Sequence, residues 1–265
     1  MICYHNVYKH ICITNILMEM TPELAEICGI HAGDGYLRFG KRTEWDISGH
    51  VEEREYYDSH VIPLIKRVFK IPLIGQFFKS RNTYGLVIRN KEVVKSLLSL
   101  GFPNGEKSTT VKIPKEILNS NDKAIYVAFL RGLFDTDGNV NFRKSYGKYI
   151  EFKKTKNHYP SINFTTVSSS LAKDLIEIFT SLDFKLCSLT YSPKNPKENK
   201  KYIVNISGRY QLEKWINTIG IKNSVKLSRY LIWKKFGFCP TNTSFNERLS
   251  ILNGKLDPNM FYKGP

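Results

Sequence analysis

The sequence predicts an α+β protein built from two pseudo-symmetric halves, each with the element order αββαββα and an antiparallel sheet. A short motif occurs twice, in residues 24–40 and 129–140, with the shared frame G-[IL]-x-x-[GT]-D-G. Helical and alternating hydrophobic patterns follow each copy in the same order, which indicates a duplicated unit. With 265 residues, 42% of them hydrophobic, the chain is long enough to form two cores.

The two motifs are predicted to be helices that pack against each other. Gly29 and Gly33 lie four residues apart, as do Gly132 and Thr136, so each pair falls on one face of its helix. Small residues on a helix face allow a second helix to approach more closely than the usual ~8–10 Å. We therefore expect the two motif helices to be direct neighbours with their C-terminal ends in one place.

Each motif helix is expected to end in an aspartate, Asp34 or Asp137, followed by Gly35 or Gly138 in the left-handed conformation. An acid at a helix C-terminus costs ~0.3–1 kcal/mol because it faces the negative end of the helix dipole. A divalent cation reverses this cost, and carboxylates with backbone carbonyls are ligands that Mg²⁺ accepts. The pair of acids indicates a metal site; solvated residues that only stop the helices are the alternative.

After each motif the pattern predicts two strands, a helix, two further strands and a closing helix. The strand directly after the motif has a dry face, with Leu37 or Val140, and a polar face on the other side. The expected helices cover 52–69 and 169–182, the later strands 72–81, 84–90, 185–192 and 201–207, and the closing helices 91–102 and 209–221.

The repeat divides the chain into five parts. Pro114 is expected to begin a short helix in the linker, and the C-terminal part is rich in Gly, Pro and Asn. The parts are an N-terminal leader at 1–20, a first half at 21–110, a linker at 111–122, a second half at 123–236 and a loosely attached tail at 237–265.

The charge of the chain indicates an acidic partner. Lys and Arg number 40 against 24 Asp and Glu, which gives a formal net charge of +16. Nucleic acid is the commonest partner of so basic a protein, and a membrane surface is the second possibility. The sequence has no apolar run long enough to span a membrane and no secretion signal, so we expect a protein of the cytoplasm or an organelle. The five scattered cysteines indicate neither a disulfide framework nor a zinc site.

At residues 27–35 and 130–138 the two motifs resemble those of the LAGLIDADG homing endonucleases. The resemblance covers about residues 21–236. Ala32 stands where the family usually has an acid at the sixth motif position, whereas the acid at the eighth position is present in both copies. The resemblance implies a monomer built as a pseudo-dimer, whose two sheets form a DNA-binding saddle over the major groove.

For function, the resemblance implies site-specific, Mg²⁺-dependent cleavage of double-stranded DNA in intron homing, with each half cutting one strand to leave short 3′ overhangs. Mn²⁺ or Ca²⁺ is expected to substitute for Mg²⁺ in binding. The catalytic lysines implied, Lys107 and Lys226, each lie six residues after a glycine at the end of the closing helix, Gly101 or Gly220. Solvated loop lysines are the alternative. The metal ligands implied are Asp34 and Asp137, assisted by the carbonyls of Gly33 and Thr136.

Side chains on the polar faces of the strands are the candidates for contact with DNA. Arginine pairs with guanine and asparagine with adenine through two hydrogen bonds, whereas other polar contacts reach phosphates and only fix the register. The candidates are Tyr36, Arg38, Gln76, Lys79, Arg81, Asn139, Asn141, Arg143, Glu151, Lys153, Lys201 and Asn205.

Two residues of the motifs have structural interpretations. We expect Asp135 to be a helix or linker contact rather than a metal ligand, and His31 to be a histidine of the helix interface rather than a catalytic base. As a function, a non-cleaving protein of the same fold, either an RNA maturase that binds intron RNA or a DNA-binding regulator, is the alternative to the nuclease. An intein is a third possibility, disfavoured because the chain neither starts with Cys or Ser nor ends in His-Asn.

Overall fold

The computed structural model describes residues 19–145, 154–195 and 197–262. The predicted leader at 1–20, except for its last two residues, and the DNA-contact candidates Glu151 and Lys153 lie outside the described residues. No helix of the described part is long and apolar enough to cross a membrane. The cysteines Cys28, Cys187 and Cys239 within this part are free thiols.

The first half contains a four-stranded antiparallel sheet with the strand order β1-β2-β4-β3. A continuous helical stretch joins β2 to β3, close to the predicted 52–69, and it includes one π-helical turn, η2. The elements are α1 (Pro22–Asp34), β1 (Gly35–Arg38), β2 (Glu44–His50), η1 (Val51–Glu53), α2 (Arg54–Tyr56), η2 (Tyr57–Val61), α3 (Ile62–Phe69), β3 (Gln76–Phe78), β4 (Thr83–Ile88) and α4 (Lys91–Ser99).

The second half repeats this arrangement with the strand order β5-β6-β8-β7. Its elements are α6 (Lys123–Asp137), β5 (Asn139–Ser145), β6 (Lys154–Thr166), α7 (Ser169–Ser181), β7 (Leu186–Tyr191), β8 (Lys201–Ser207) and α8 (Arg209–Thr218). The linker holds the short helix α5 (Lys115–Leu118), which Pro114 precedes as predicted. The expected α+β fold with two similar halves is confirmed.

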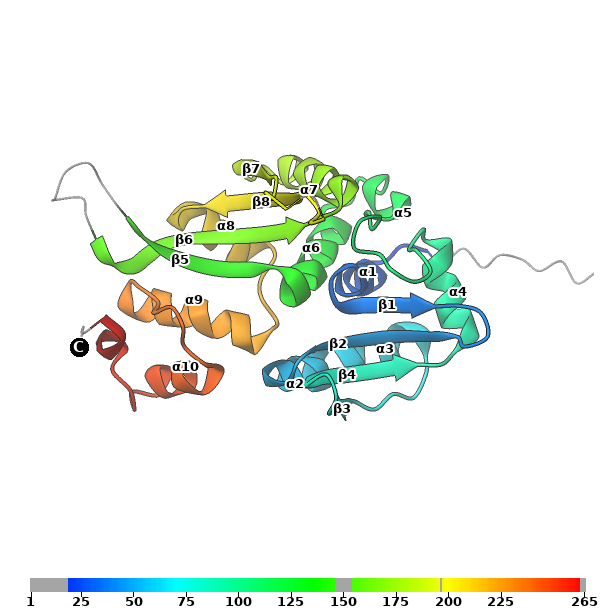
Figure 1. Ribbon diagram of the computed structural model, residues 1–265, viewed down its shortest axis with the longest axis horizontal. Coiled ribbons are helices and arrows are strands. Elements are labelled where there is room, and N and C mark those ends of the chain that lie inside the picture. Colours follow the sequence, from blue (N-terminus) through cyan, green and yellow to red (C-terminus); the bar gives the residue numbers. More distant parts are fainter. Residues whose placement is uncertain (1–18, 146–153, 196, 263–265) are drawn as a thin grey trace, which may run out of the picture.

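The motif helices α1 and α6 lie side by side between the two sheets (Figure 1). A Cβ atom added to Gly29 would lie 2.1 Å from the Phe129 carbonyl oxygen, and one added to Gly132 would lie 2.2 Å from the Glu26 carbonyl oxygen. Each glycine therefore contacts the backbone of the opposite helix, where no side chain fits. The close approach predicted from the motif is confirmed.

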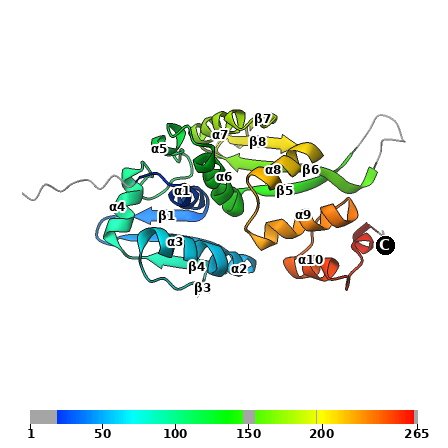
Figure 2. The ribbon, with the colours of Figure 1, turned by 180° about the vertical axis from the view of Figure 1, so that it is seen from behind.

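Both sheets have one face covered by helices and one face free of them. Figure 1 shows the strands toward the viewer, whereas in Figure 2, seen from behind, α3 and α8 lie in front of them. Leu37 and Val140 point into the core, while Tyr36 and Asn139 are exposed on the uncovered face. The alternation predicted for the strands after the motifs is confirmed.

The prediction of left-handed glycines after the motif helices is wrong. Gly35 has φ −81° and ψ 147°, and Gly138 has φ −73° and ψ 161°, so both are extended and lead directly into a strand. The reason for glycine is steric, since an added Cβ would lie 2.0 Å from His31 Nδ1 at Gly35 and 2.3 Å from Phe134 Cδ2 at Gly138.

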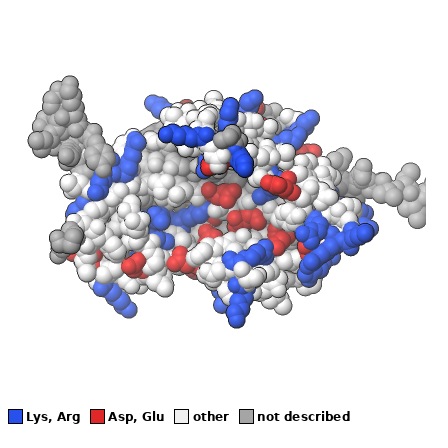
Figure 3. Space-filling view, in the orientation of Figure 1, with Lys and Arg blue, Asp and Glu red and all other residues white. Residues whose placement is uncertain are grey.

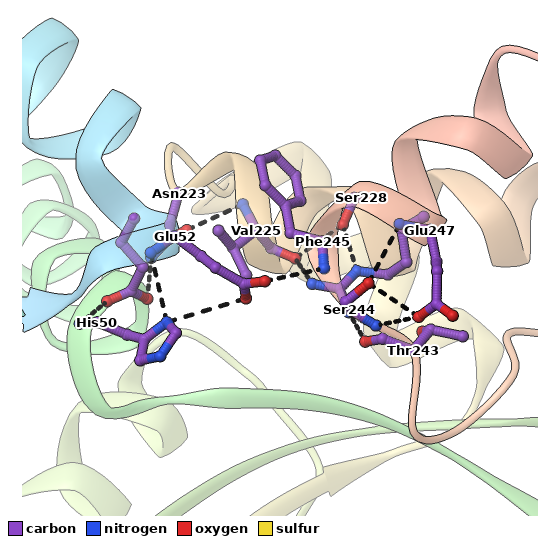
Figure 4. Close-up of polar contacts among 11 residues, drawn as sticks. His50, Glu52, Asn223, Val225, Ser228, Thr243, Ser244, Phe245 and Glu247 are labelled. Atoms are coloured by element: carbon purple, nitrogen blue, oxygen red, sulfur yellow. Dashed lines mark hydrogen bonds and ion pairs between the residues drawn. The ribbon is translucent and has the colours of Figure 1, made fainter. Parts of the chain in front are cut away.

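The prediction of a loosely attached tail at 237–265 is also wrong for the part described. After α9 (Ser224–Phe236), which the sequence analysis did not separate as a helix, the chain forms α10 (Phe245–Leu252) and the short helix η4 (Pro258–Tyr262). Cys239, Arg248 and Ile251 are buried. Arg248 donates to Ser228 Oγ of α9 at 2.8 Å and to the carbonyl of Thr243, so α10 is fixed to α9 (Figure 4).

Candidate active site and nucleic-acid interface

The structure brings the two motif acids together at the C-terminal ends of α1 and α6. Asp34 is half-buried and Asp137 is exposed. Burial and the nearby charge of Asp137 raise the pKa of Asp34 to about 7, although a hydrogen bond from Tyr57 opposes the shift. Two carboxylates whose charges repel each other at one place are the arrangement that a divalent cation neutralises.

Both predicted lysines lie at these helix ends. Lys107 Nζ donates to the Gly33 carbonyl at 2.6 Å, and Lys226 Nζ donates to the carbonyls of Phe134 at 2.7 Å and Thr136 at 2.5 Å. Burial lowers the pKa of both ammonium groups, while the two motif acids oppose this shift. Both side chains are half-buried and bound to carbonyls of a helix terminus, so neither is a freely solvated loop lysine, and their catalytic role stays a prediction.

The donors at this place fit a Mg²⁺ ion held mainly by carboxylates and water. The carbonyl oxygens of Gly33 and Thr136, the assisting ligands that the resemblance implied, already accept a lysine hydrogen bond and keep one lone pair each. In the described part of the chain no group of three or more His, Cys, Asp or Glu side chains gathers as a metal site. Two carboxylates with several waters are a normal Mg²⁺ environment.

Asp135 holds the segment that carries Lys226. Its Oδ2 accepts from the Lys222 amide at 2.9 Å and its Oδ1 from the Asn223 amide at 3.2 Å, while Asn223 Nδ2 donates to the Asp135 carbonyl at 2.8 Å. Burial raises the pKa of Asp135 to about 6, and the two amides oppose that shift. The side chain thus binds the segment that joins α8 to α9 rather than the linker at 111–122, and Ala32 offers no such group in the first half.

His31 packs against Trp45 of β2 and Phe102 in the core of the first half. It is fully buried, and its Nδ1 accepts a hydrogen bond from Trp45 Nε1 at 3.0 Å. Burial keeps the pKa of its imidazole well below the usual value, so the ring is neutral. The burial agrees with the expectation that His31 is not a catalytic base, but its partners belong to β2 and to the segment after α4 rather than to α6, and its Nε2 has no hydrogen-bond partner among the described residues.

The sequence analysis missed Tyr57 and Glu53, which lie beside Asp34. Tyr57 Oη donates to Asp34 Oδ2 at 2.6 Å, and burial together with the Asp34 charge keeps the Tyr57 pKa well above its usual value, so the hydroxyl stays a donor. Glu53 accepts from Asn223 Nδ2 at 2.7 Å. Nothing in the local pattern of 52–69 distinguishes these residues from the rest of an amphipathic helix.

The C-terminal helices also contact the first half near this place. The Phe245 amide of α10 donates to Glu52 Oε1 at 3.3 Å (Figure 4). Asn223, the N-cap of α9, donates to the neighbouring Glu53. Residues far apart in the chain therefore fix the start of the 51–69 helical stretch from two sides.

In the first half the uncovered face of the sheet carries acids beside the predicted arginines. Arg38 forms an ion pair with Glu44 at 3.4 Å, and Arg81 forms one with Asp46 at 3.0 Å. Glu44 and Asp46 were missed, although residues 44–48 alternate polar and apolar side chains and thus had a strand signal. Tyr36, Gln76 and Lys79 are exposed as expected.

In the second half the candidates that the structure describes are asparagines, an arginine and a lysine. Asn139, Arg143 and Lys201 are exposed, and Arg143 stacks over the Tyr159 ring at 4.8 Å from its centre. Asn141 and Asn205 are partly exposed, and Asn205 Nδ2 donates to Ser207 Oγ at 2.9 Å. On the face shown in Figure 3, acidic side chains gather in the middle and basic ones surround them.

Comparisons with known proteins agree with the resemblance of the two motifs to the LAGLIDADG homing endonucleases. Residues 124–220 match the family model described as a LAGLIDADG-like domain. A solved structure of mesophilic variants of the homing endonuclease I-DmoI has 16% identity and a TM-score of 0.51, with 76% of this chain and 97% of that chain covered. The structure of I-SmaMI bound to its uncleaved DNA target with calcium ions has 11% identity and a TM-score of 0.51, with 88% and 92% covered.

Among curated proteins, the replication factor C small subunit of Methanocaldococcus jannaschii is 28% identical over 214 residues, which is 80% of this chain. This chain spans only 10% of the length of that relative. The family match over residues 124–220 and the fold shared with the solved structures agree with the repeated motif. The resemblance to the LAGLIDADG homing endonuclease family is thereby confirmed.

Proposed function

We propose that this protein is a site-specific double-strand DNA endonuclease of the homing type, active as a monomer with a divalent cation. The observation that supports it most is the meeting of Asp34 and Asp137 beside Lys107 and Lys226 at one place between two uncovered sheet faces. A protein that only bound nucleic acid would gain nothing from two mutually repelling acids at the centre of a surface that must accept phosphates.

Asp34 and Asp137 are proposed to hold Mg²⁺, with Mn²⁺ or Ca²⁺ replacing it for binding. When bound, the ion supplies Lewis-acid polarisation of a phosphate oxygen and a more acidic water. The ammonium groups of Lys107 and Lys226, fixed by helix carbonyls, lie beside the acids and stabilise the charge that develops on the phosphate during attack. Each half then cuts one strand, which leaves short 3′ overhangs.

The duplex is proposed to lie across both uncovered sheet faces, with the strands in its major groove. Arg143, Asn139 and Asn141 have the side chains for direct base contacts in the second half. In the first half Arg38 and Arg81 are held by carboxylates, which fixes their orientation before binding. The acid of such a pair can itself accept from the amino group of cytosine.

The alternative, a non-cleaving maturase or regulator, is less favoured. Such a protein would bind intron RNA or DNA with the same faces and would need neither motif acid. Gel-shift competition between intron RNA and duplex DNA separates the two functions, and the salt dependence of binding gives the number of phosphates contacted.

The direct test is cleavage of a plasmid that carries the uninterrupted insertion locus. We expect one double-strand cut with Mg²⁺ and none with EDTA. Asp34→Asn together with Asp137→Asn should abolish cleavage, whereas Asp183→Asn, a matched change at a fully exposed acid, should leave it intact. Undiminished cleavage by the double variant would refute the proposal.

A further inference from the structure

The two halves hold their motif acids differently. In the first half, Tyr57 lies in the π-helical turn Tyr57–Val61 and is 0% exposed. Its hydroxyl donates to Asp34 Oδ2 at 2.6 Å, so one oxygen of this carboxylate is fixed and the other is left for a further ligand. π-helical turns inside α-helices occur often at functional sites, because they move one side chain out of the regular helical register.

The neighbouring strand leaves room for this contact. A Cβ atom on Gly49 of β2 would lie 2.4 Å from Glu53 Oε2, 2.9 Å from Asp34 Oδ2 and 3.1 Å from Tyr57 Oη. Three side-chain oxygens from two helices therefore converge on the space that the missing side chain leaves. Any larger residue at position 49 would separate Tyr57 from Asp34.

The second half has no equivalent of this hydrogen bond. Asp137 is exposed, and no hydrogen bond or ion pair of the described residues holds its carboxylate. Instead, a cavity of about 250 Å³ opens beside it, and Leu171 and Leu175 of α7 contribute apolar side chains to its wall. The helix that supplies Tyr57 in the first half thus supplies no donor in the second.

We propose that Tyr57 is a positioning residue that orients the Asp34 carboxylate toward the divalent cation, and that this support serves one strand of the target only. The inference rests on the proposed nuclease function. A hydroxyl that donates to a ligating carboxylate restricts its rotation and stabilises its charged form, and loss of such an outer partner costs roughly 10–100-fold in metal affinity or activity.

The test uses Tyr57→Phe in the full chain, with Tyr56→Phe as its matched control. Tyr56 is the adjacent residue of the same helical stretch, is equally buried, and its hydroxyl has no hydrogen-bond partner among the described residues. Each variant loses one buried hydroxyl, and only Tyr57→Phe loses the contact with Asp34. Thermal unfolding of both variants reports any general loss of structure.

Cleavage is measured on a target labelled separately at each strand, at limiting and at saturating Mg²⁺. We expect Tyr57→Phe to slow one strand about tenfold or more at limiting Mg²⁺, so that nicked DNA accumulates, and to recover at saturating Mg²⁺. Tyr56→Phe should cut both strands like the wild type. Equal slowing of both strands by Tyr57→Phe, or no slowing, would overturn the proposal.

A second measurement does not depend on cleavage. Calorimetric titration of the free proteins with Mn²⁺ should show about tenfold weaker binding for Tyr57→Phe than for the wild type and for Tyr56→Phe. If the wild type cuts no DNA, the proposed function fails, and this titration still decides the positioning role. If the wild type cuts DNA and the three proteins bind Mn²⁺ equally, only the inference about Tyr57 fails.

Discussion

Glu26 of α1 is the residue whose substitution should most clearly weaken the joint between the two halves. It is 3% exposed and accepts hydrogen bonds from Arg131 of α6 at 2.6 and 3.0 Å. His60 Nε2 contacts the same carboxylate at 2.6 Å. Burial alone would raise the pKa of Glu26, but His60 and Arg131 outweigh it and lower the pKa to about 2.

The size of the effect follows from this shift. One pKa unit corresponds to about 1.4 kcal/mol, so a change from 4.5 to about 2 makes the charged form contribute roughly 3 kcal/mol to folding. Glu26→Gln removes that charge and leaves the half-buried Arg131 without its carboxylate partner; breaking a fully buried pair costs about 3–5 kcal/mol. We therefore expect Glu26→Gln to lower the free energy of unfolding by about 3 kcal/mol at pH 7.

The pH dependence has a definite sign. Because the pKa of Glu26 is lower in the folded than in the unfolded protein, its contribution is complete above pH 4.5 and is lost as the pH falls toward 2. In urea unfolding, the difference in free energy of unfolding between wild type and Glu26→Gln should be smaller at pH 3 than at pH 7. Glu92→Gln, at an acid paired with Lys95 and mostly exposed, is the control and should cost little. An equal loss in the two variants at pH 7 would refute the reasoning.

Three further changes test the rest of the structure. Gly132→Ala should destabilise by more than about 2 kcal/mol in urea unfolding, because the added methyl meets the Glu26 carbonyl at 2.2 Å; a neutral result would contradict the close helix packing. Asn223→Ala, which frees the segment before Lys226, should lower the cleavage rate while DNA affinity in a gel shift stays unchanged. Arg143→Gln should weaken DNA binding. If the slope of log binding constant against log salt concentration becomes about one unit less steep, Arg143 contacts a phosphate; if the sequence preference changes instead, it contacts a base.

Local patterns were sufficient for the elements of the two repeated halves up to residue 221 and for the placement of the two acids at the ends of the motif helices. Thr21 and Ser168, residue types that are common at helix N-caps, accept amide hydrogen bonds from Leu24 and Leu171, both at 3.2 Å. Two predictions from local signals were wrong. Gly35 is required by close contact with His31 and not by a left-handed turn. The polar segment expected to be a loose tail forms α10 and packs on a neighbouring helix. In both cases a tertiary contact determines the conformation, and the adjacent sequence does not indicate that contact.

The arginines on the uncovered sheet face of the first half show the same limit. Arg38 was correctly placed on the uncovered face, since alternation along a strand needs only the local sequence. Its pairing with Glu44 depends on β1 lying antiparallel to β2 with Arg38 opposite Glu44, which is a property of the sheet. The electrostatic state of that face therefore could not be predicted from composition or net charge.

By itself, the sequence determined that the protein is a duplicated α+β unit, that two helices meet through small residues, and that Asp34 and Asp137 end them. These features depend on periodicity and on residue size, which are local. Only the tertiary structure decided that Tyr57 supports one acid alone, that Lys226 binds two carbonyls of α6, and that Asn223 reaches Glu53 across 170 residues of sequence. Such contacts form because the packing of helices and sheets brings distant side chains together. The positions of these side chains along the chain do not predict them.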